Sequence, residues 1–171
     1  MAKESTDKFV NRAYVSITES AAGTLTFKEL ETGVSVFDKA GWIIHRISYY
    51  LDNTSLNEFG AASDQLIAGI TVSNKVASLD LSDPAVIDLF NLAIRPIGTP
   101  ANFQWWLQPF TRDFSTLPMG GILIPPRPVY LAVISAGFAS PAVLNARFEF
   151  TVRSLTPDEY WELVESYRII S

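Results

Sequence analysis

The chain has 171 residues, of which 48% are hydrophobic, 12% aromatic and 18% charged. This length and composition fit one globular domain with a sizeable core, and they exclude disorder over most of the chain. The chain contains no cysteine, which excludes disulfide frameworks, zinc ribbons, thiol nucleophiles and iron–sulfur centres.

The net charge of −5 arises in one part of the chain. Between positions 52 and 94, acidic residues greatly outnumber the single basic residue, Lys75. A phosphate backbone is bound by clustered Lys and Arg side chains, and the N-terminus carries only a few of these, interspersed with acidic ones. We therefore expect no direct binding to nucleic acid.

No targeting or membrane-spanning segment is predicted. The N-terminal residues MAKESTDKF are polar, unlike the apolar core of a signal peptide, so we expect the protein to be made and folded in a cytosol. The longest apolar runs, 120–126 and 129–135, are far shorter than the roughly 20 residues of a membrane-spanning helix. They are typical of buried strands.

Alternation of apolar and polar residues predicts β-strands in the first half of the chain. They cover residues 11–19, 24–30, 42–51 and 65–73. The third is rich in aromatic and β-branched residues, which favour strands. One face of this strand is expected to hold Ile43, His45, Ile47, Tyr49 and Leu51, opposite Arg46 and Ser48.

Residues 82–90 fit two interpretations. Ser82 and Asp83 followed by Pro84 are typical of a helix start, because such side chains cap free backbone N–H groups and proline fits the first turn. The apolar residues that follow also fit a strand. We expect a short accessory helix here, with a strand as the alternative.

The second half of the chain is predicted to form further strands at 103–107, 121–124, 130–135 and 146–154. In the last of these, apolar residues at even positions alternate with charged or polar ones, as in a strand with one solvated face. The strand 130–135 is apolar on both faces, so we expect it in the centre of a sheet. Prolines concentrate between these segments, where they mark corners.

A C-terminal helix is predicted to begin after Thr156. Thr156 is the N-cap, Pro157 occupies the first helical position, and Glu159 completes a capping box. Apolar side chains then recur with helical spacing. They are Tyr160, Leu163, Val164 and Tyr167.

Together these segments predict an all-β fold, a single β-sandwich or barrel of about eight strands, with a C-terminal helix and one short accessory helix. We expect residues 1–9 to form an N-terminal arm and residues 10–155 to form the sandwich. Residues 156–171 would form a helix packed on or beside it. Nothing in the sequence indicates a second domain.

Catalytic and metal-binding patterns are sparse. His45 is the single histidine, and its expected place on an apolar face favours a hydrogen-bonded core imidazole over a catalytic base, since no nucleophile motif accompanies it. The segment DLSDPAVID lacks the Gly and the terminal Glu of an EF-hand loop. The glutamates of the C-terminal helix are better explained as a solvated face. We expect no enzyme activity, no cofactor and no metal site.

Several large aromatic side chains need a partner. In a strand, Trp105 and Trp106 point to opposite faces, so at most one of them enters the core. Trp161 falls one position away from the apolar stripe of its helix. These side chains fit a subunit interface, where aromatic residues are enriched. A sugar-binding platform and packing within the chain are the alternatives.

The segment PPRPVYLAVISAG, followed by ARFEFTVRSLTPDEYWELVES, resembles the closing strands and C-terminal helix of single jelly-roll coat proteins of small icosahedral viruses. The likeness covers the plan of the whole chain. It implies a jelly-roll sandwich that assembles laterally with copies of itself, and with other capsid proteins, into the shell of a virion. Subunit contacts would then come from Trp105, Trp106, Arg127, Tyr160 and Trp161.

Coat proteins that package nucleic acid directly often carry a strongly basic N-terminal arm, which this chain lacks. The resemblance is therefore to tailless, membrane-containing viruses, in which another protein or an internal lipid membrane separates the shell from the genome. Lys3, Lys8 and Arg12 would then lie on the inner face, against that membrane. A position on the capsid exterior is the alternative.

Two other classes of protein stay open. A carbohydrate- or receptor-binding β-sandwich module of a virus or phage would use the same aromatics to stack on sugars, and a minor or decoration capsid protein would share the whole plan. An enzyme on a cupin-like jelly roll is disfavoured, because its metal normally needs two or more histidines and the chain has only His45.

Overall fold

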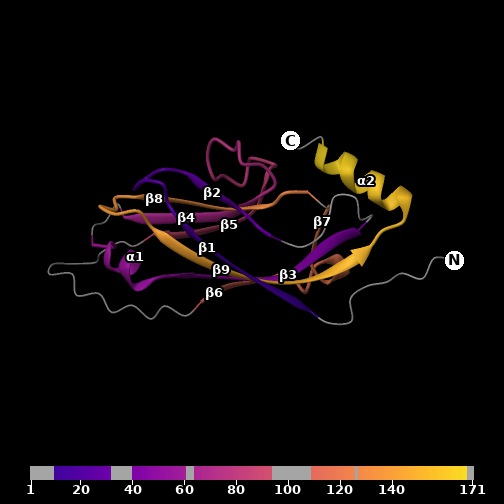
Figure 1. The fold of residues 1–171 in the computed structure, drawn as a ribbon, viewed down its shortest axis with the longest axis horizontal. Helices are drawn as coiled ribbons and strands as arrows, with labels where there is room; N and C mark the ends of the chain where they lie inside the picture. The colour runs from indigo at the N-terminus through magenta and orange to yellow at the C-terminus, as the bar shows by residue number, and fades with distance from the viewer. Residues whose placement is uncertain (1–9, 32–39, 61–63, 94–108, 126, 169–171) are drawn as a thin grey trace.

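A computed structural model describes residues 10–31, 40–60, 64–93, 109–125 and 127–168, which form two antiparallel sheets stacked as a sandwich (Figure 1). The strands are β1 (Asn11–Thr18), β2 (Thr26–Glu29), β3 (Ala40–Leu51), β4 (Gln65–Thr71), β5 (Val86–Ala93), β6 (Phe110–Asp113), β7 (Ile122–Ile124), β8 (Tyr130–Ala136) and β9 (Val143–Ser154). The helices are α1 (Asn53–Asn57), the 3₁₀ turn η1 (Pro118–Gly120) and α2 (Pro157–Arg168).

The order of the strands is that of a jelly roll. Sheet A has the order β1-β9-β3-β6, with β7 also paired to β3, and sheet B has the order β2-β8-β4-β5. Successive antiparallel pairs are nested in the sequence: β1 with β9, β2 with β8, β3 with β6 and β7, and β4 with β5. These pairs alternate between the two sheets, as in a wound double Greek key. The predicted all-β jelly-roll sandwich is confirmed.

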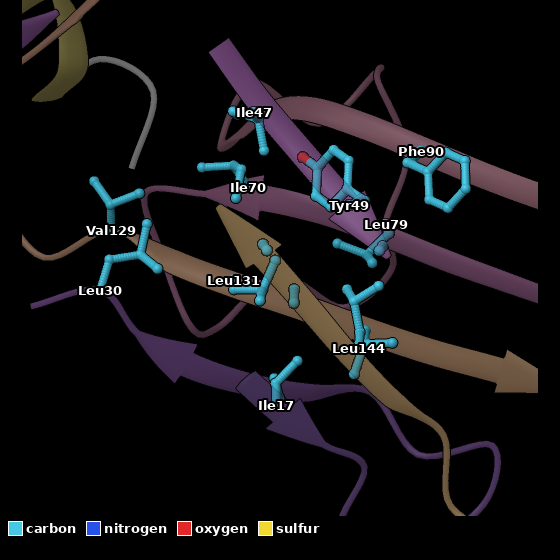
Figure 2. Packing of buried hydrophobic residues seen from close by; sticks show 14 of the residues in the cluster. Ile17, Leu30, Ile47, Tyr49, Ile70, Leu79, Phe90, Val129, Leu131 and Leu144 are labelled. Carbon is cyan, nitrogen blue, oxygen red and sulfur yellow. The ribbon is translucent and has the colours of Figure 1, made fainter. Parts of the chain in front are cut away.

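The core lies between the sheets and is formed by the inward positions of both (Figure 2). In β9, Leu144, Ala146 and Phe148 are fully buried at alternating positions, as the sequence predicts. Strand β8 lies between β2 and β4, which confirms its predicted central place. Among the described residues no helix is long and apolar enough to cross a membrane.

The face of β3 differs from the predicted one. The pairing of β3 with β9 shifts its register between Ile44 and Arg46. Before this irregularity the buried core residues are Trp42 and Ile44, and after it they are Ile47, Tyr49 and Leu51. An extra residue in a strand exchanges the two faces beyond it. Alternation alone predicts that His45 and Ile47 share a core face. The irregularity in β3 separates them, so this prediction is wrong for His45.

The expected accessory helix at 82–90 is wrong, because Val86–Ala93 is strand β5. Asp83 does accept a hydrogen bond from the backbone, but it does so in a turn and not at the start of a helix. Its side chain accepts the N–H of Ala85 at 2.8 Å. The short helix that the structure contains is α1, where the side chain of Asp52 accepts the N–H of Ser55. Strand β6 was not predicted from the sequence, whereas the predicted strand 103–107 lies outside the described residues.

Helix α2 begins as its sequence predicts. Thr156 Oγ1 accepts the N–H of Glu159 at 3.3 Å, and Glu159 Oε2 accepts the N–H of Thr156 at 2.9 Å, which is a reciprocal capping box. Glu159 Oε1 also accepts a hydrogen bond from Arg153 Nη2 at 3.1 Å. This contact ties α2 to β9 at one end of the sandwich, and α1 lies at the other end (Figure 1).

Candidate interaction surface

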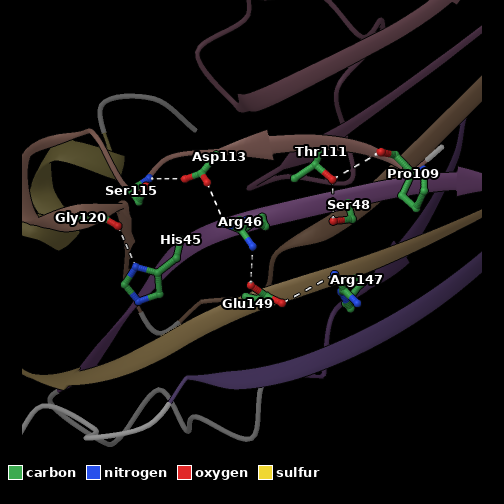
Figure 3. A network of polar contacts seen from close by, with 10 residues as sticks. All are labelled: His45, Arg46, Ser48, Pro109, Thr111, Asp113, Ser115, Gly120, Arg147 and Glu149. Carbon is green, nitrogen blue, oxygen red and sulfur yellow. Dashed lines mark hydrogen bonds and ion pairs between the residues drawn. The ribbon is translucent and has the colours of Figure 1, made fainter.

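A row of alternating charges crosses the outer face of sheet A. Cross-strand pairing aligns Arg12 on β1, Glu149 on β9, Arg46 on β3 and Asp113 on β6. Arg46 lies 2.9 Å from Asp113 Oδ2 and 3.5 Å from Glu149 Oε2 (Figure 3). Arg12 Nε lies 3.5 Å from Glu149 Oε1. Opposite charges at facing positions stabilise a sheet, so this row also fixes the lateral alignment of the strands.

Next to this row, the same face is hollowed. The hollow measures about 380 Å³ and reaches from the end of β3 to α1. Tyr14, Arg147 and Ser48 line it at facing positions of β1, β9 and β3. The other lining residues are Tyr50, Leu51, Asn53, Leu56 and Pro109. Aromatic rings beside one guanidinium form a site for an apolar group that carries or adjoins a negative charge.

Helix α2 presents a second distinctive surface. Trp161 is 61% exposed, and its ring meets the edge of Tyr160 at a centroid distance of 5.5 Å. Leu163 and Val164 are half-buried, and Leu163 borders a groove that Leu123 and Leu155 also line, whereas Glu162 and Glu165 are exposed. The helix therefore half-buries one stripe and exposes a large aromatic ring among carboxylates.

The structure describes three of the five residues predicted to form the interface, Arg127, Tyr160 and Trp161. Arg127 is half-buried, and its Nη2 donates to the carbonyl of Val72 at 3.0 Å, so it braces a loop of sheet B. Tyr160 and Trp161 lie together on α2. Arg12 joins the charged row, with its side chain 62% exposed. Lys3, Lys8, Trp105 and Trp106 lie outside the described residues.

His45 has a structural environment. Its Nδ1 lies 2.7 Å from the carbonyl of Gly120, and its Nε2 lies 2.9 Å from Thr151 Oγ1. A carbonyl oxygen only accepts, so Nδ1 carries the proton and donates. Both ring nitrogens are thus engaged, and they hold η1 against sheet A. Within the described ranges, no group of three or more His, Cys, Asp or Glu side chains could hold a metal ion.

Sequence reasoning missed three buried carboxylates among the described residues, those of Glu19, Asp64 and Asp88. Glu19 is 3% exposed and Asp88 is 2% exposed. Asp88 accepts hydrogen bonds from Tyr49 Oη at 2.9 Å and from Arg112 Nε at 3.1 Å, which joins sheet B to sheet A. For Asp88, the sequence signal of burial is an acidic residue at an inward position of an alternating strand. This signal can be read only once residues 86–93 are recognised as a strand.

Carboxylates also hold the turn between β8 and β9. Glu58 Oε2 accepts the N–H groups of Ala139 and Ser140 at 2.8 and 3.2 Å. Gly137 has a positive φ of 83°, and a Cβ at this position would collide with the carboxylate of Asp64. Only glycine fits there without strain. The turn is thereby packed against the segment that follows α1.

These contacts predict acid sensitivity. The backbone hydrogen bond from Ala139 holds the pKa of Glu58 below its usual value, and the bonds from Ser115 do the same for the pKa of Asp113. A lowered folded-state pKa contributes stability above the unfolded pKa, near 4, and loses it as pH falls through the folded value. We expect the free energy of unfolding, measured in urea, to decrease below about pH 4.

Glu58→Gln is the matching variant for this prediction. It removes one of the titrating groups, so its free energy of unfolding should depend less on pH between about pH 5 and pH 2 than that of the unsubstituted chain. An identical acid dependence in both proteins would contradict the assignment.

The fold and its surfaces define a class: a jelly-roll β-sandwich with a charged outer face and an aromatic helix at one end. No protein-family model and no curated protein matches the sequence. Among solved structures, the chain is similar to one described as "Unassembled KI Polyomavirus VP1 Pentamer", with a TM-score of 0.43 and 11% identity, over 85% of this chain and 94% of that chain. This is a distant likeness to a viral capsid protein, and it does not extend to function.

Proposed function

We propose that the protein is a capsid subunit that assembles laterally with copies of itself into a viral shell. A jelly-roll sandwich suits this role because its two sheets share one close-packed core and form rigid lateral walls. Identical walls associate under symmetry. Fold alone does not establish function, so the proposal depends on the surface.

The observation that carries the proposal is the exposure of Trp161 on α2. A tryptophan side chain offers about 150–250 Å² of contact area, and such rings are typical centres of protein interfaces. Trp161 is 61% exposed, whereas Leu163 and Val164 of the same helix are half-buried. Its exposure is therefore a property of the isolated chain that a neighbouring subunit would remove.

The Trp161→Ala variant tests this function. We expect it to weaken self-association at least tenfold, about 1.4 kcal/mol, because an interface anchor is lost. The melting temperature of the monomer should not change, since the ring is exposed. Sedimentation velocity and electron microscopy at raised protein concentration measure association.

Leu81→Ala is the control, because Leu81 is 66% exposed on the loop between β4 and β5. It should associate like the unsubstituted chain. The proposal would be contradicted if Trp161→Ala associates like the unsubstituted chain. It would also be contradicted if the weaker association comes with a clearly lower melting temperature of the monomer.

A carbohydrate- or receptor-binding module is the second candidate. The observation in its favour is the hollow beside Tyr14, where an exposed aromatic ring lies near the polar side chains of Ser48 and Asn53. Such a module binds glycans as an isolated chain, whereas a shell subunit needs no such binding. A glycan array probed with the purified chain therefore separates the two functions.

A further inference from the structure

We infer that helix α2 of one subunit docks into the hollow on the outer face of sheet A of the next, with Trp161 entering the hollow and Glu162 facing Arg147. This inference rests on the proposed function, because it names the two surfaces that meet when copies of the chain assemble. The occupant is a second copy of this chain.

The hollow has the size and lining of a receptor site for an aromatic ring. Its volume of about 380 Å³ falls in the range of about 300–1,000 Å³ typical of ligand sites. Tyr14 is 64% exposed at its rim, and Leu51, Leu56 and Pro109 supply apolar contacts. Aromatic rings in offset or edge-to-face contact attract each other beyond the effect of the area they bury.

Among the described residues that line the hollow, Arg147 alone carries a charge. Arg12, Arg46 and Arg147 all approach Glu149, at 3.5, 3.5 and 3.7 Å, and only Arg46 also has Asp113. The contact of Arg147 is longer than a hydrogen bond, and its Nε, like that of Arg46, is buried without an acceptor among the described residues. Arg46 differs because its Nη2 donates to Asp113 at 2.9 Å. Arg147 is thus the least satisfied cation of the group. A carboxylate from outside would complete its contacts.

Helix α2 supplies the complementary surface. Its exposed residues Asp158, Trp161, Glu162 and Glu165 follow one another at the i, i+3, i+4 and i+7 positions that share a helix face. One stripe therefore carries a tryptophan flanked by carboxylates. Glu159, in contrast, is already engaged with Arg153. The stripe matches the hollow in both parts, since an aromatic ring meets aromatic rings and a carboxylate meets the guanidinium of Arg147.

The fold prevents a chain from filling its own hollow. The hollow is lined by Asn53 and Leu56 of α1, and α1 and α2 lie at opposite ends of the long axis of the molecule (Figure 1). Helix α2 follows directly from β9, whose end it contacts through Arg153. The contact is therefore between different surfaces of two copies. Repeated contacts of this kind close into rings or continue as open arrays.

Charge exchange tests the pairing. Arg147→Glu and Glu162→Arg should each weaken self-association at least tenfold, measured by sedimentation velocity. An equimolar mixture of the two variants should restore association to within about threefold of the unsubstituted chain, because each variant then meets a partner of opposite charge. Lys75→Glu is the control, since it makes the same charge change at an exposed loop residue and should associate normally.

Each outcome decides the matter. Normal association of both variants, or lost association that mixing does not restore, overturns the docking inference. If Trp161→Ala abolishes assembly while the charge variants do not, the capsid function stands and the docking surface lies elsewhere. Circular dichroism confirms folding of each variant. If Arg147→Glu does not fold, Arg147→Gln replaces it: weaker association than the unsubstituted chain supports the inference, and equal association overturns it.

Discussion

Replacing Glu19 by Ala is expected to lower the free energy of unfolding by about 4 kcal/mol, because two buried backbone N–H groups lose their acceptor at about 1–3 kcal/mol each. Glu19 Oε1 accepts the N–H of Ser135 at 2.6 Å, and Oε2 accepts Ser135 Oγ at 2.7 Å and the N–H of Ala142 at 2.8 Å. Ser135 belongs to sheet B and Ala142 precedes β9 of sheet A. One carboxylate thus holds both sheets together.

Urea denaturation followed by tryptophan fluorescence measures this loss. Glu29→Ala is the matched control, because Glu29 is exposed on β2, and its free energy of unfolding should be almost unchanged. Glu19→Gln should fall between the two, since an amide keeps one acceptor oxygen but places a donor against another donor. A Glu19→Ala variant as stable as Glu29→Ala would show that water replaces the carboxylate at no cost.

Asp88→Ala is expected to lower the free energy of unfolding by about 3 kcal/mol, since removing one partner of a buried charged contact leaves the others uncompensated. Burial raises the pKa of Tyr49 well above its usual value, and the Asp88 carboxylate raises it further. The phenol therefore stays protonated and donates. Arg112 is 45% exposed, so its guanidinium turns to water, and this keeps the loss below that of a fully buried pair.

Tyr49→Phe separates the parts of this contact. It removes only the hydroxyl and keeps the aromatic ring at position 49 stacked on Phe90, with ring centroids 5.6 Å apart. We expect it to lower the free energy of unfolding by about 1 kcal/mol. In a double-mutant cycle, the hydroxyl should cost much less once Asp88 is already Ala. Additive losses in the two variants would show that Tyr49 and Asp88 contribute independently.

Local patterns predicted the elements whose residues are constrained by near neighbours. The alternation in β9, the apolar run of β8 and the capping box of α2 were all correct, because side-chain period and capping depend on a few adjacent residues. The same reasoning placed Trp161 outside the buried stripe of α2, and the structure gives that side chain high exposure.

Pairing between distant strands defeated the local patterns elsewhere. Residues typical of a helix start precede residues 86–93, yet these pair with β4 as a strand. The inward carboxylate of Asp88 is tolerated because Tyr49 and Arg112 of sheet A donate hydrogen bonds to it. The faces of β3 depend on an irregularity that its partner β9 reveals. Neither partner could be known from the segment itself.

The amino-acid sequence by itself determined the all-β class, the terminal helix and the absence of cysteine chemistry, because composition and short-range periodicity specify these. Only the tertiary structure decided the winding of the two sheets, the burial of Glu19 and Asp88, and the hollow beside Arg147. Each of these joins residues from strands far apart in the chain. The contacts that create these features exist only after the two sheets have packed on one another.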